Sequence, residues 1–176
     1  MSDDAARGQR IGVSVKLTID GPKAASPTAC EHVMRSLPQW FGIESALVRY
    51  ARDAETLPSF TALVSGEPVG FATIKRHFTH SAELHCIAVH ADYRARGIGR
   101  ALLAACELWL LNEGVHMLHV KTLGPSHASV HFALTRRFYE QAGFIPLEEL
   151  PNVWEDNPCL LMAKPLPSLE HPVPDR

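Results

Sequence analysis

The segment 82–113 constrains the fold of this chain more than any other, because it joins three features in a fixed order. An apolar run, AELHCIAV, leads into YRARGIGR at 93–100, which holds three arginines and two glycines, and a helical pattern then runs to Glu113. A helix that begins in such a turn leaves its first N–H groups unpaired and carries partial positive charge there. Glycines also let the backbone approach a ligand closely. The segment therefore predicts a strand, an anion-binding turn and a helix.

Two common anion-binding turns do not fit these residues. A nucleoside-triphosphate loop needs lysine and then serine or threonine after Gly99, where the chain has Arg100 and Ala101. A dinucleotide-binding turn needs a third glycine at the position of Leu102. The spacing that does fit is R-x-x-G-x-G, which runs from Arg94 to Gly99.

The chain as a whole predicts one mixed α/β domain with one central sheet. With 176 residues, 46% of them hydrophobic, it can bury a single core. We expect the domain to cover residues 11–165, between a flexible N-terminus, 1–10, and a flexible proline-rich tail, 166–176. A breaker at 21–27 and a capping box from Thr28 to Glu31 are expected to precede the first helix. Periodicity and turn residues predict strands at 11–19, 60–66, 68–78, 82–89, 116–123, 144–150 and 158–166, and helices at 28–37, 44–56, 98–113 and 130–142.

In the glycine-rich turn at 93–100 and in a later helix, the chain resembles the GNAT superfamily of acetyl-coenzyme-A-dependent N-acetyltransferases. The segment 84–103, LHCIAVHADYRARGIGRALL, is similar to the family's fourth strand, loop and third helix. The segment 135–144, TRRFYEQAGF, is similar to its fourth helix, with the frequent F-Y-x-x-x-G-F signature. The resemblance extends over the element order from Ile11 to Pro165. It implies a single GNAT-like domain of the α/β (α+β) class with a mixed, mostly antiparallel central sheet, in the order β-α-α-β-β-β-α-β-α-β-β.

The resemblance implies acetyl-CoA as the co-substrate and no metal. In the family, backbone amides of the loop hold the pyrophosphate of coenzyme A, and main-chain groups of the preceding strand contact the pantetheine arm. The corresponding strand positions here are Ile87, Ala88 and Val89, and the loop positions are Arg94, Ala95, Arg96, Gly97, Ile98, Gly99 and Arg100. The side chains of Ile87 and Val89 are also expected in the core.

Acetyl transfer to an amine needs a base for the amine, a donor for the thioester oxyanion and an acid for the leaving thiolate. Glu83 is the first candidate base, because it matches the general-base glutamate of the histone-acetylating branch of the family. Period-two alternation puts His85 on the same face, so His85 is the second candidate. The same face is expected to carry Ile87 and Val89. Tyr139 matches the family tyrosine whose hydroxyl lies near the coenzyme sulfur and is the candidate acid.

One position departs from the family pattern. Many relatives carry an asparagine seven residues before the tyrosine, where it contacts the pantetheine, and this chain has Phe132 there. Ser126, Ser129 and His131 in the preceding loop are candidates to replace it.

Charge and cysteine spacing narrow the choice of partners and compartment. A formal net charge of -2 and a pI near 6.5 disfavour nucleic-acid binding. The N-terminus predicts no signal peptide and no apolar run has membrane-helix length, so we expect a cytoplasmic protein without membrane contact. The cysteines lie too far apart for a zinc motif and predict buried thiols at Cys30, Cys86, Cys106 and Cys159.

The histidines raise the question of a metal site. His77, His80, His85 and His90 fall along two adjacent predicted strands. A metal needs three or four converging ligands, and acetyl transfer needs no metal, so we expect these histidines to line the acceptor cleft or its rim.

The leading hypothesis is an N-acetyltransferase that transfers the acetyl group directly to a primary amine of a small molecule or peptide. Trp40, Phe41 and Tyr50 are candidate aromatic walls for that amine, and they equally fit helix packing. The alternative hypothesis is a non-catalytic acyl-CoA-binding sensor or partner-binding module. The sequence identifies no substrate, and monomer and homodimer both stay open.

Overall fold

The computed structural model describes residues 16–154 and 157–167. Its elements follow one another in the predicted order, with a short 3₁₀ turn added between β4 and α3. The strands are β1 (Leu17–Lys23), β2 (Ser59–Val64), β3 (Glu67–Phe78), β4 (Ser81–Val89), β5 (Met117–Leu123), β6 (Ile145–Trp154) and β7 (Asn157–Pro165). The helices are α1 (Pro27–Arg35), α2 (Glu44–Thr56), α3 (Ile98–Asn112) and α4 (Val130–Gln141), and the 3₁₀ turn is η1 (Ala91–Tyr93).

The sheet is mixed and mostly antiparallel, as predicted. Its strands lie in the order β1-β2-β3-β4-β5-β7-β6, and β4 with β5 forms the parallel pair. The β2–β3 hairpin turns through Ser65 and Gly66, whose φ angles are 53° and 88°. Two consecutive positive φ angles match the twist of the flanking strands. The turn thus begins earlier than the predicted strand bounds, 60–66 and 68–78, indicated.

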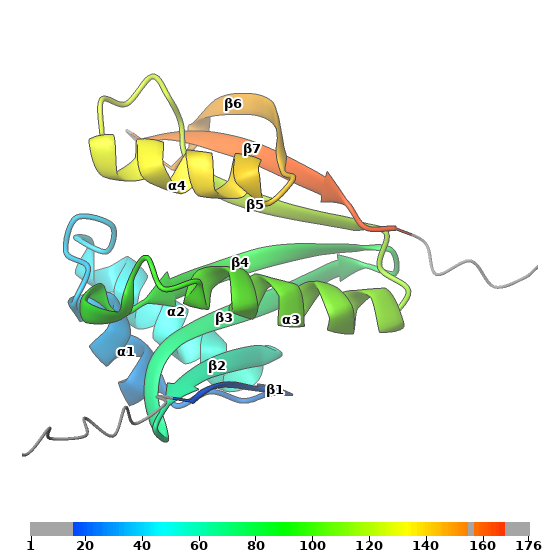
Figure 1. Ribbon diagram of the computed structural model, residues 1–176. Coiled ribbons are helices and arrows are strands. Elements are labelled where there is room, and N and C mark those ends of the chain that lie inside the picture. The colour runs from blue at the N-terminus through cyan, green and yellow to red at the C-terminus, as the bar shows by residue number, and fades with distance from the viewer. Residues whose placement is uncertain (1–15, 155–156, 168–176) are drawn as a thin grey trace, which may run out of the picture.

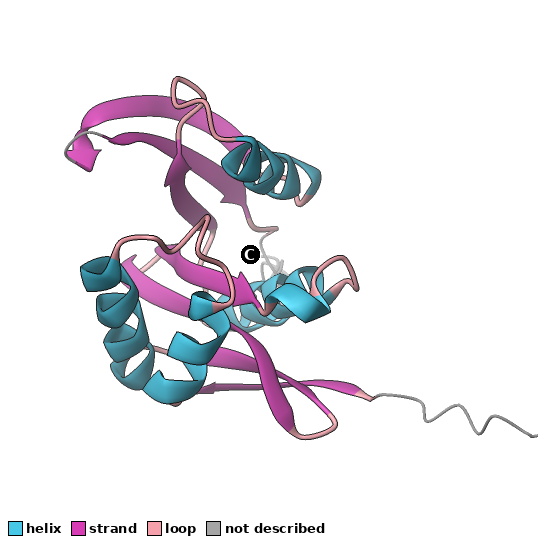
Figure 2. Ribbon diagram, turned by 90° about the vertical axis from the view of Figure 1, so that its left-hand side faces the viewer, coloured by secondary structure: helices cyan, strands magenta, loops and turns pink. Residues whose placement is uncertain are grey.

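Helices cover both faces of the half of the sheet that contains β3 and β4. Figure 2 shows α1 and α2 on one side of these strands and α3 on the other. Helix α4 lies on the same side as α3, over β5 and β6 (Figure 1). Two separate hydrophobic clusters fill these layers. One joins α1 and α2 to Phe71, Cys86 and Ala88, and the other joins α3 to the inner faces of the strands and to Tyr139 of α4.

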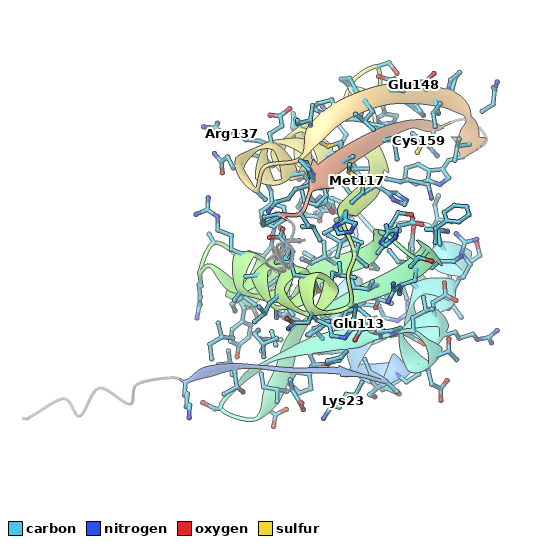
Figure 3. All side chains as sticks on the ribbon, turned by 90° about the vertical axis from the view of Figure 1, so that its right-hand side faces the viewer. Lys23, Glu113, Met117, Arg137, Glu148 and Cys159 are labelled. Carbon is cyan, nitrogen blue, oxygen red and sulfur yellow. The ribbon has the colours of Figure 1, made fainter. Side chains whose placement is uncertain are left out.

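The parallel strands β4 and β5 pair only where they begin. Ser81 to Glu83 pair with Met117 to His119, and beyond these residues the two strands diverge (Figure 1). Met117, labelled in Figure 3, therefore lies where the space between the diverging strands is closed by their pairing. The other end lies at the carboxyl ends of both strands, beside the start of α3, a common place for ligands in α/β sheets. We call the space between the diverging strands the β4–β5 opening.

Several predicted boundaries differ from the structure. Residues 21–23, expected to break the chain, continue β1 to Lys23. The predicted capping box is wrong, because Ser26 caps α1 by accepting a hydrogen bond from the N–H of Ala29. Pro27 then occupies the first turn, where its missing N–H costs little.

The two predicted flexible ends lie largely outside the described residues. The whole segment 1–10 and the first part of the predicted strand, 11–15, belong to that region, as do residues 168–176. Leu166 belongs to the described part, where it is buried and donates its N–H to the carbonyl of His116. The packed domain thus extends at least one residue beyond the predicted boundary.

No helix in the described ranges is long and apolar enough to cross a membrane. The four cysteines are buried and free, which confirms the prediction of buried thiols.

Candidate active site

The turn between β4 and α3 exposes backbone donors at the mouth of the β4–β5 opening. Gly97 is the N-cap residue of α3 with φ 80°, and Ala95 also has a positive φ, 58°. No side chain of the described residues caps this helix, and its first backbone hydrogen bond runs from Ala101 to Gly97. The N–H groups of Ile98, Gly99 and Arg100 therefore remain available to an anion.

The arginines of this turn are held by the protein itself. The Arg96 guanidinium donates to the carbonyl of Asp92 at 2.8 Å, and Arg100 donates to Gln141 at 3.3 Å. Arg94 lies over the Trp40 ring, 4.2 Å from its centroid. Because all three side chains have intramolecular partners, the backbone is the better-prepared donor for an anion.

A β-bulge in β4 changes which residues share a face. Thr73 of β3 lies opposite Cys86, and the next residue, Ile74, lies opposite Leu84, so His85 is the extra residue of a bulge. After the bulge, Ile87 and Val89 pack toward the α3 cluster. The expectation that they share a face with Glu83 and His85 is wrong, because strict alternation holds only in a regular strand.

Glu83 lies on the face opposite to the α3 cluster, at the closed end of the opening. Its carboxylate accepts a hydrogen bond from His77 at 2.6 Å and from Lys121 at 3.0 Å, and His119 lies 3.8 Å away. Burial alone would raise the pKa of Glu83, but the contacts with His119, His77 and Lys121 outweigh burial and hold the pKa well below its ordinary value. A carboxylate so well paired is a weak proton acceptor.

His85 reaches a different set of partners on α2. Its Nε2 lies 2.8 Å from the Asp53 carboxylate, and its ring packs against Tyr50 with centroids 5.2 Å apart. A carboxylate can only accept a hydrogen bond, so Nε2 carries the proton and the Nδ1 lone pair is left as a proton acceptor. Sequence reasoning missed Asp53, because no local pattern links a helix residue to a strand residue 32 positions later.

Tyr139 lies on α4 and is almost fully buried, with 5% of its surface exposed. Burial raises the pKa of its hydroxyl, and Cys86 of β4 and Tyr50 of α2 raise it further. The hydroxyl therefore stays protonated, as a proton donor must.

The family of the chain follows from this site together with a direct match. The acetyltransferase (GNAT) family model matches residues 28–144, about two thirds of the chain. This chain belongs to the GNAT acetyltransferase family. The matched segment includes the turn at α3 and the signature of α4, the two places on which the resemblance rested.

Individual GNAT relatives are distant. A mycothiol acetyltransferase from Propionibacterium freudenreichii subsp. shermanii is 30% identical over 141 residues, which cover 77% of this chain and 39% of that protein. The protein of the same name from Nocardiopsis dassonvillei is 24% identical over 142 residues, 76% of this chain and 38% of that protein. This chain thus spans about two fifths of the length of these curated relatives.

Solved GNAT structures share the fold. The ribosomal-protein-S18-alanine N-acetyltransferase from Escherichia coli has a TM-score of 0.69 at 24% identity, over 89% of this chain and 97% of that one. A GNAT family acetyltransferase from Elizabethkingia anophelis, solved with acetyl-CoA bound, has a TM-score of 0.64 at 18% identity, over 85% of this chain and 98% of that one.

The loop residues expected to replace the GNAT asparagine are engaged elsewhere. Ser129 caps α4 by accepting from the N–H of Phe132, and Ser126 donates to the Glu149 carboxylate. His131 packs against the Trp40 ring, with centroids 4.9 Å apart. None of the three is prepared to receive a pantetheine amide.

Thr122 carries a buried polar group that is free to bind a ligand. It lies on β5 beyond the residues that pair with β4, and it is 4% exposed. Within the described part of the chain, its hydroxyl is the buried side-chain group without a hydrogen-bond partner. An unpaired buried hydroxyl costs about 1–3 kcal/mol unless a ligand pairs with it. The residues around the opening therefore fit an acyl-CoA, and Thr122 gave no signal in the sequence because its environment depends on the diverging strands.

Trp40 links the α1–α2 connection to both sides of the opening. Its indole N–H donates to the Thr135 hydroxyl of α4 at 3.0 Å, and its ring carries Arg94 from the anion-binding turn. Phe41 and Tyr50, the other predicted wall residues, pack against each other at 6.3 Å, so they serve the helix layer. Of the three predicted wall residues, Trp40 is therefore the best candidate to contact an acceptor amine.

Proposed function

We propose that this GNAT protein is an N-acetyltransferase that transfers an acetyl group from acetyl-CoA directly to the primary amine of a small molecule or peptide. The observation that carries the proposal is the β4–β5 opening with the uncapped N-terminus of α3 at its mouth. Membership of the family supports acetyl-CoA as the donor. The four free, buried cysteines support a reducing compartment such as the cytoplasm.

Three groups of residues would hold acetyl-CoA. The N–H groups at the start of α3 bind the pyrophosphate, where the helix dipole also favours negative charge. The edge of β4 at Ile87, Ala88 and Val89, unpaired on the β5 side, binds the pantetheine as an added strand would be bound. The Thr122 hydroxyl pairs with a pantetheine amide from the β5 side.

His85 is the better candidate base, and Glu83 is the alternative. The amine nitrogen attacks the thioester carbonyl carbon and gives up a proton, which the Nδ1 atom of His85 takes while Asp53 positions the ring. The Glu83 carboxylate, held by Lys121 and His77, has less tendency to take that proton. A main-chain N–H near Ile87 or Val89 stabilises the oxyanion.

Tyr139 completes the reaction as the acid. The carbon–sulfur bond breaks, the coenzyme thiolate leaves, and the Tyr139 hydroxyl supplies its proton. Its burial keeps that proton in place until the thiolate forms. The leaving thiolate is basic enough to take a proton, and a buried neutral hydroxyl beside it can donate one.

The acceptor reaches the thioester from the side that carries His85 and Trp40. Of the relatives described above, one is named a mycothiol acetyltransferase and another a ribosomal-protein-S18-alanine N-acetyltransferase, so their names leave both small molecules and peptides open as acceptors. The Trp40 ring on this side favours an amine with a partly apolar body.

An amine panel tests the proposal. The protein is incubated with acetyl-CoA and with aromatic amines, polyamines, aminoglycosides or a peptide beginning with alanine, and both free thiol and acetylated amine are measured. We expect amine-dependent thiol release matched by an equal amount of acetylated amine. Tight binding of acetyl-CoA without any acetylated amine would instead identify the chain as a non-catalytic acyl-CoA sensor.

A further inference from the structure

Three potential metal ligands meet on neighbouring strands at the closed end of the β4–β5 opening. They are His77 of β3, Glu83 of β4 and His119 of β5, and their ligand atoms lie within 4.8 Å of one another. The Nε2 atoms of His77 and His119 lie 2.6 Å and 3.8 Å from the Oε2 atom of Glu83. The two imidazole rings lie side by side, with centroids 5.3 Å apart.

The strand register explains why these residues converge. Glu83 and His119 are direct neighbours in the parallel pair of β4 and β5. On the other side of β4, the pairing shifts between Arg76 and Phe78, so His77 is an extra residue of a bulge. A bulge redirects a side chain, and here it brings His77 to the Glu83 carboxylate.

We propose that His77, Glu83 and His119 form a binding site for a divalent transition-metal ion, with zinc as the best chemical match. Two imidazoles and one carboxylate are a common zinc ligand set that leaves one coordination position for water. Zinc bonds of about 2.1 Å in a tetrahedron place ligand atoms about 3.4 Å apart. The two distances to Glu83 fall on either side of that value, and the ligand atoms of the two histidines lie within 4.8 Å of each other, so the three ligand atoms already lie close to one another.

Lys121 fixes the orientation that such an ion requires. Its ammonium group lies 3.0 Å from Oε1 of Glu83, which leaves Oε2 free to face the two histidines. A group that holds the second oxygen of a metal-binding carboxylate orients the ligand and raises the affinity for the metal. Lys121 alone can also neutralise Glu83, so an ion-free salt-bridge cluster is the competing explanation for the same contacts.

Access to the cluster is open from one side. The Glu83 side chain is 8% exposed, whereas the side chains of His77 and His119 are 31% and 20% exposed. His119 and Lys121 also line a groove of about 520 Å³ on the outer face of β5, β7 and β6, together with apolar residues such as Ile145 and Leu147. An ion can therefore enter without opening of the core.

Direct titration with zinc and cobalt tests this site independently of any acetyltransferase activity. Zinc binding is measured by calorimetry on the wild-type chain and on His77→Ala and His119→Ala, after removal of bound metals. We expect one zinc per chain in the wild type and a loss of affinity above about 100-fold in each variant, since even an outer partner contributes about 10–100-fold. Cobalt should give the visible absorption of a tetrahedral site in the wild type, and that absorption should disappear in both variants.

The chain supplies a matched control. His80 and His116 form a second histidine pair on neighbouring segments, with ring centroids 4.8 Å apart, and among the described residues no third ligand forms a metal-binding group with them. His80→Ala should bind zinc as the wild type does. The proposal is overturned if the wild type binds no zinc, or if His77→Ala and His119→Ala, shown to be folded by circular dichroism, bind zinc with unchanged affinity. Loss of binding in His80→Ala alone would assign the zinc to that other pair, which also overturns it.

Discussion

Among single residues, Tyr139 has the environment that most directly predicts a measurable pH profile. Tyr139→Phe should leave acetyl-CoA affinity unchanged and lower turnover, because the thiolate then leaves without a proton donor. Raising the pH should not relieve the deficit. Burial raises the pKa of Tyr139 above its ordinary value of 10.0, so the wild-type hydroxyl stays protonated below that pH and causes no loss of rate there. Steady-state kinetics from pH 7 upward measure both effects, and a variant with wild-type turnover would remove Tyr139 from the mechanism.

The base assignment rests on the different partners of His85 and Glu83. His85→Ala should lower turnover by ~10²–10⁴-fold near neutral pH, with much of the loss recovered at high pH, where the acceptor amine is already neutral. Asp53→Asn should produce a smaller loss with the same pH trend, because Asp53 only positions the ring. Glu83→Gln serves as the comparison. A severe, pH-recoverable loss in Glu83→Gln together with an active His85→Ala would return the role of base to Glu83.

Thr122 allows affinity and stability to be separated. Thr122→Val keeps the shape of the side chain and removes the buried hydroxyl that has no partner among the described residues. The free energy of unfolding without ligand should stay equal or rise, since an unsatisfied buried polar group is lost. Acetyl-CoA affinity should fall by about tenfold, or about 1.4 kcal/mol. Chemical denaturation and equilibrium binding measure the two quantities, and a drop in stability with unchanged affinity would show that Thr122 has a structural role only.

At the scale of elements, the turn between β4 and α3 should act through its backbone. Gly97→Val should weaken acetyl-CoA binding by more than tenfold, about 1.4 kcal/mol, because φ 80° disfavours a β-branched residue and the turn must then change shape. Arg96→Ala should have a small effect, because that side chain is bonded to Asp92. Gly114→Val is the control, since Gly114 has φ 71° and free space around it but lies at the other end of α3. If Arg96→Ala weakens binding most, side-chain charge and not backbone geometry defines the site.

The same elements show what a sequence can and cannot reveal. Helix and strand types followed from local periodicity, and the turn at Gly97 and the α4 signature at Tyr139 indicated the family, which is confirmed, and a candidate cofactor site, which stays a prediction. The bulge at His85 did not follow, because it depends on the register between β3 and β4 and leaves no local mark in the chain. For the same reason, the sequence did not predict that His85 pairs with Asp53 or that Glu83 pairs with Lys121. A turn or a helix signature can be predicted from neighbouring residues. The choice between two candidate bases depends on contacts between residues that are distant in the sequence.

For the whole molecule, the two hydrophobic clusters and the β4–β5 opening define how a ligand would affect stability. The α1–α2 layer and the α3 layer pack on opposite faces of the same strands, and β5 joins β4 through only a short parallel pairing. A ligand that fills the opening therefore bridges the two halves of the sheet. A ligand that binds the folded chain and not the unfolded chain must raise the free energy of unfolding by mass action.

Thermal unfolding with matched ligands tests the central claim, that the β4–β5 opening and the start of α3 form an acetyl-CoA site. The chain is melted alone and with acetyl-CoA, ATP or NAD at equal concentrations. At ~100 times its dissociation constant, acetyl-CoA should stabilise the fold by ~2.7 kcal/mol, and ATP and NAD should have no comparable effect, because they lack a pantetheine arm for β4 and Thr122. Equal stabilisation by ATP, or none by acetyl-CoA, would contradict the claim.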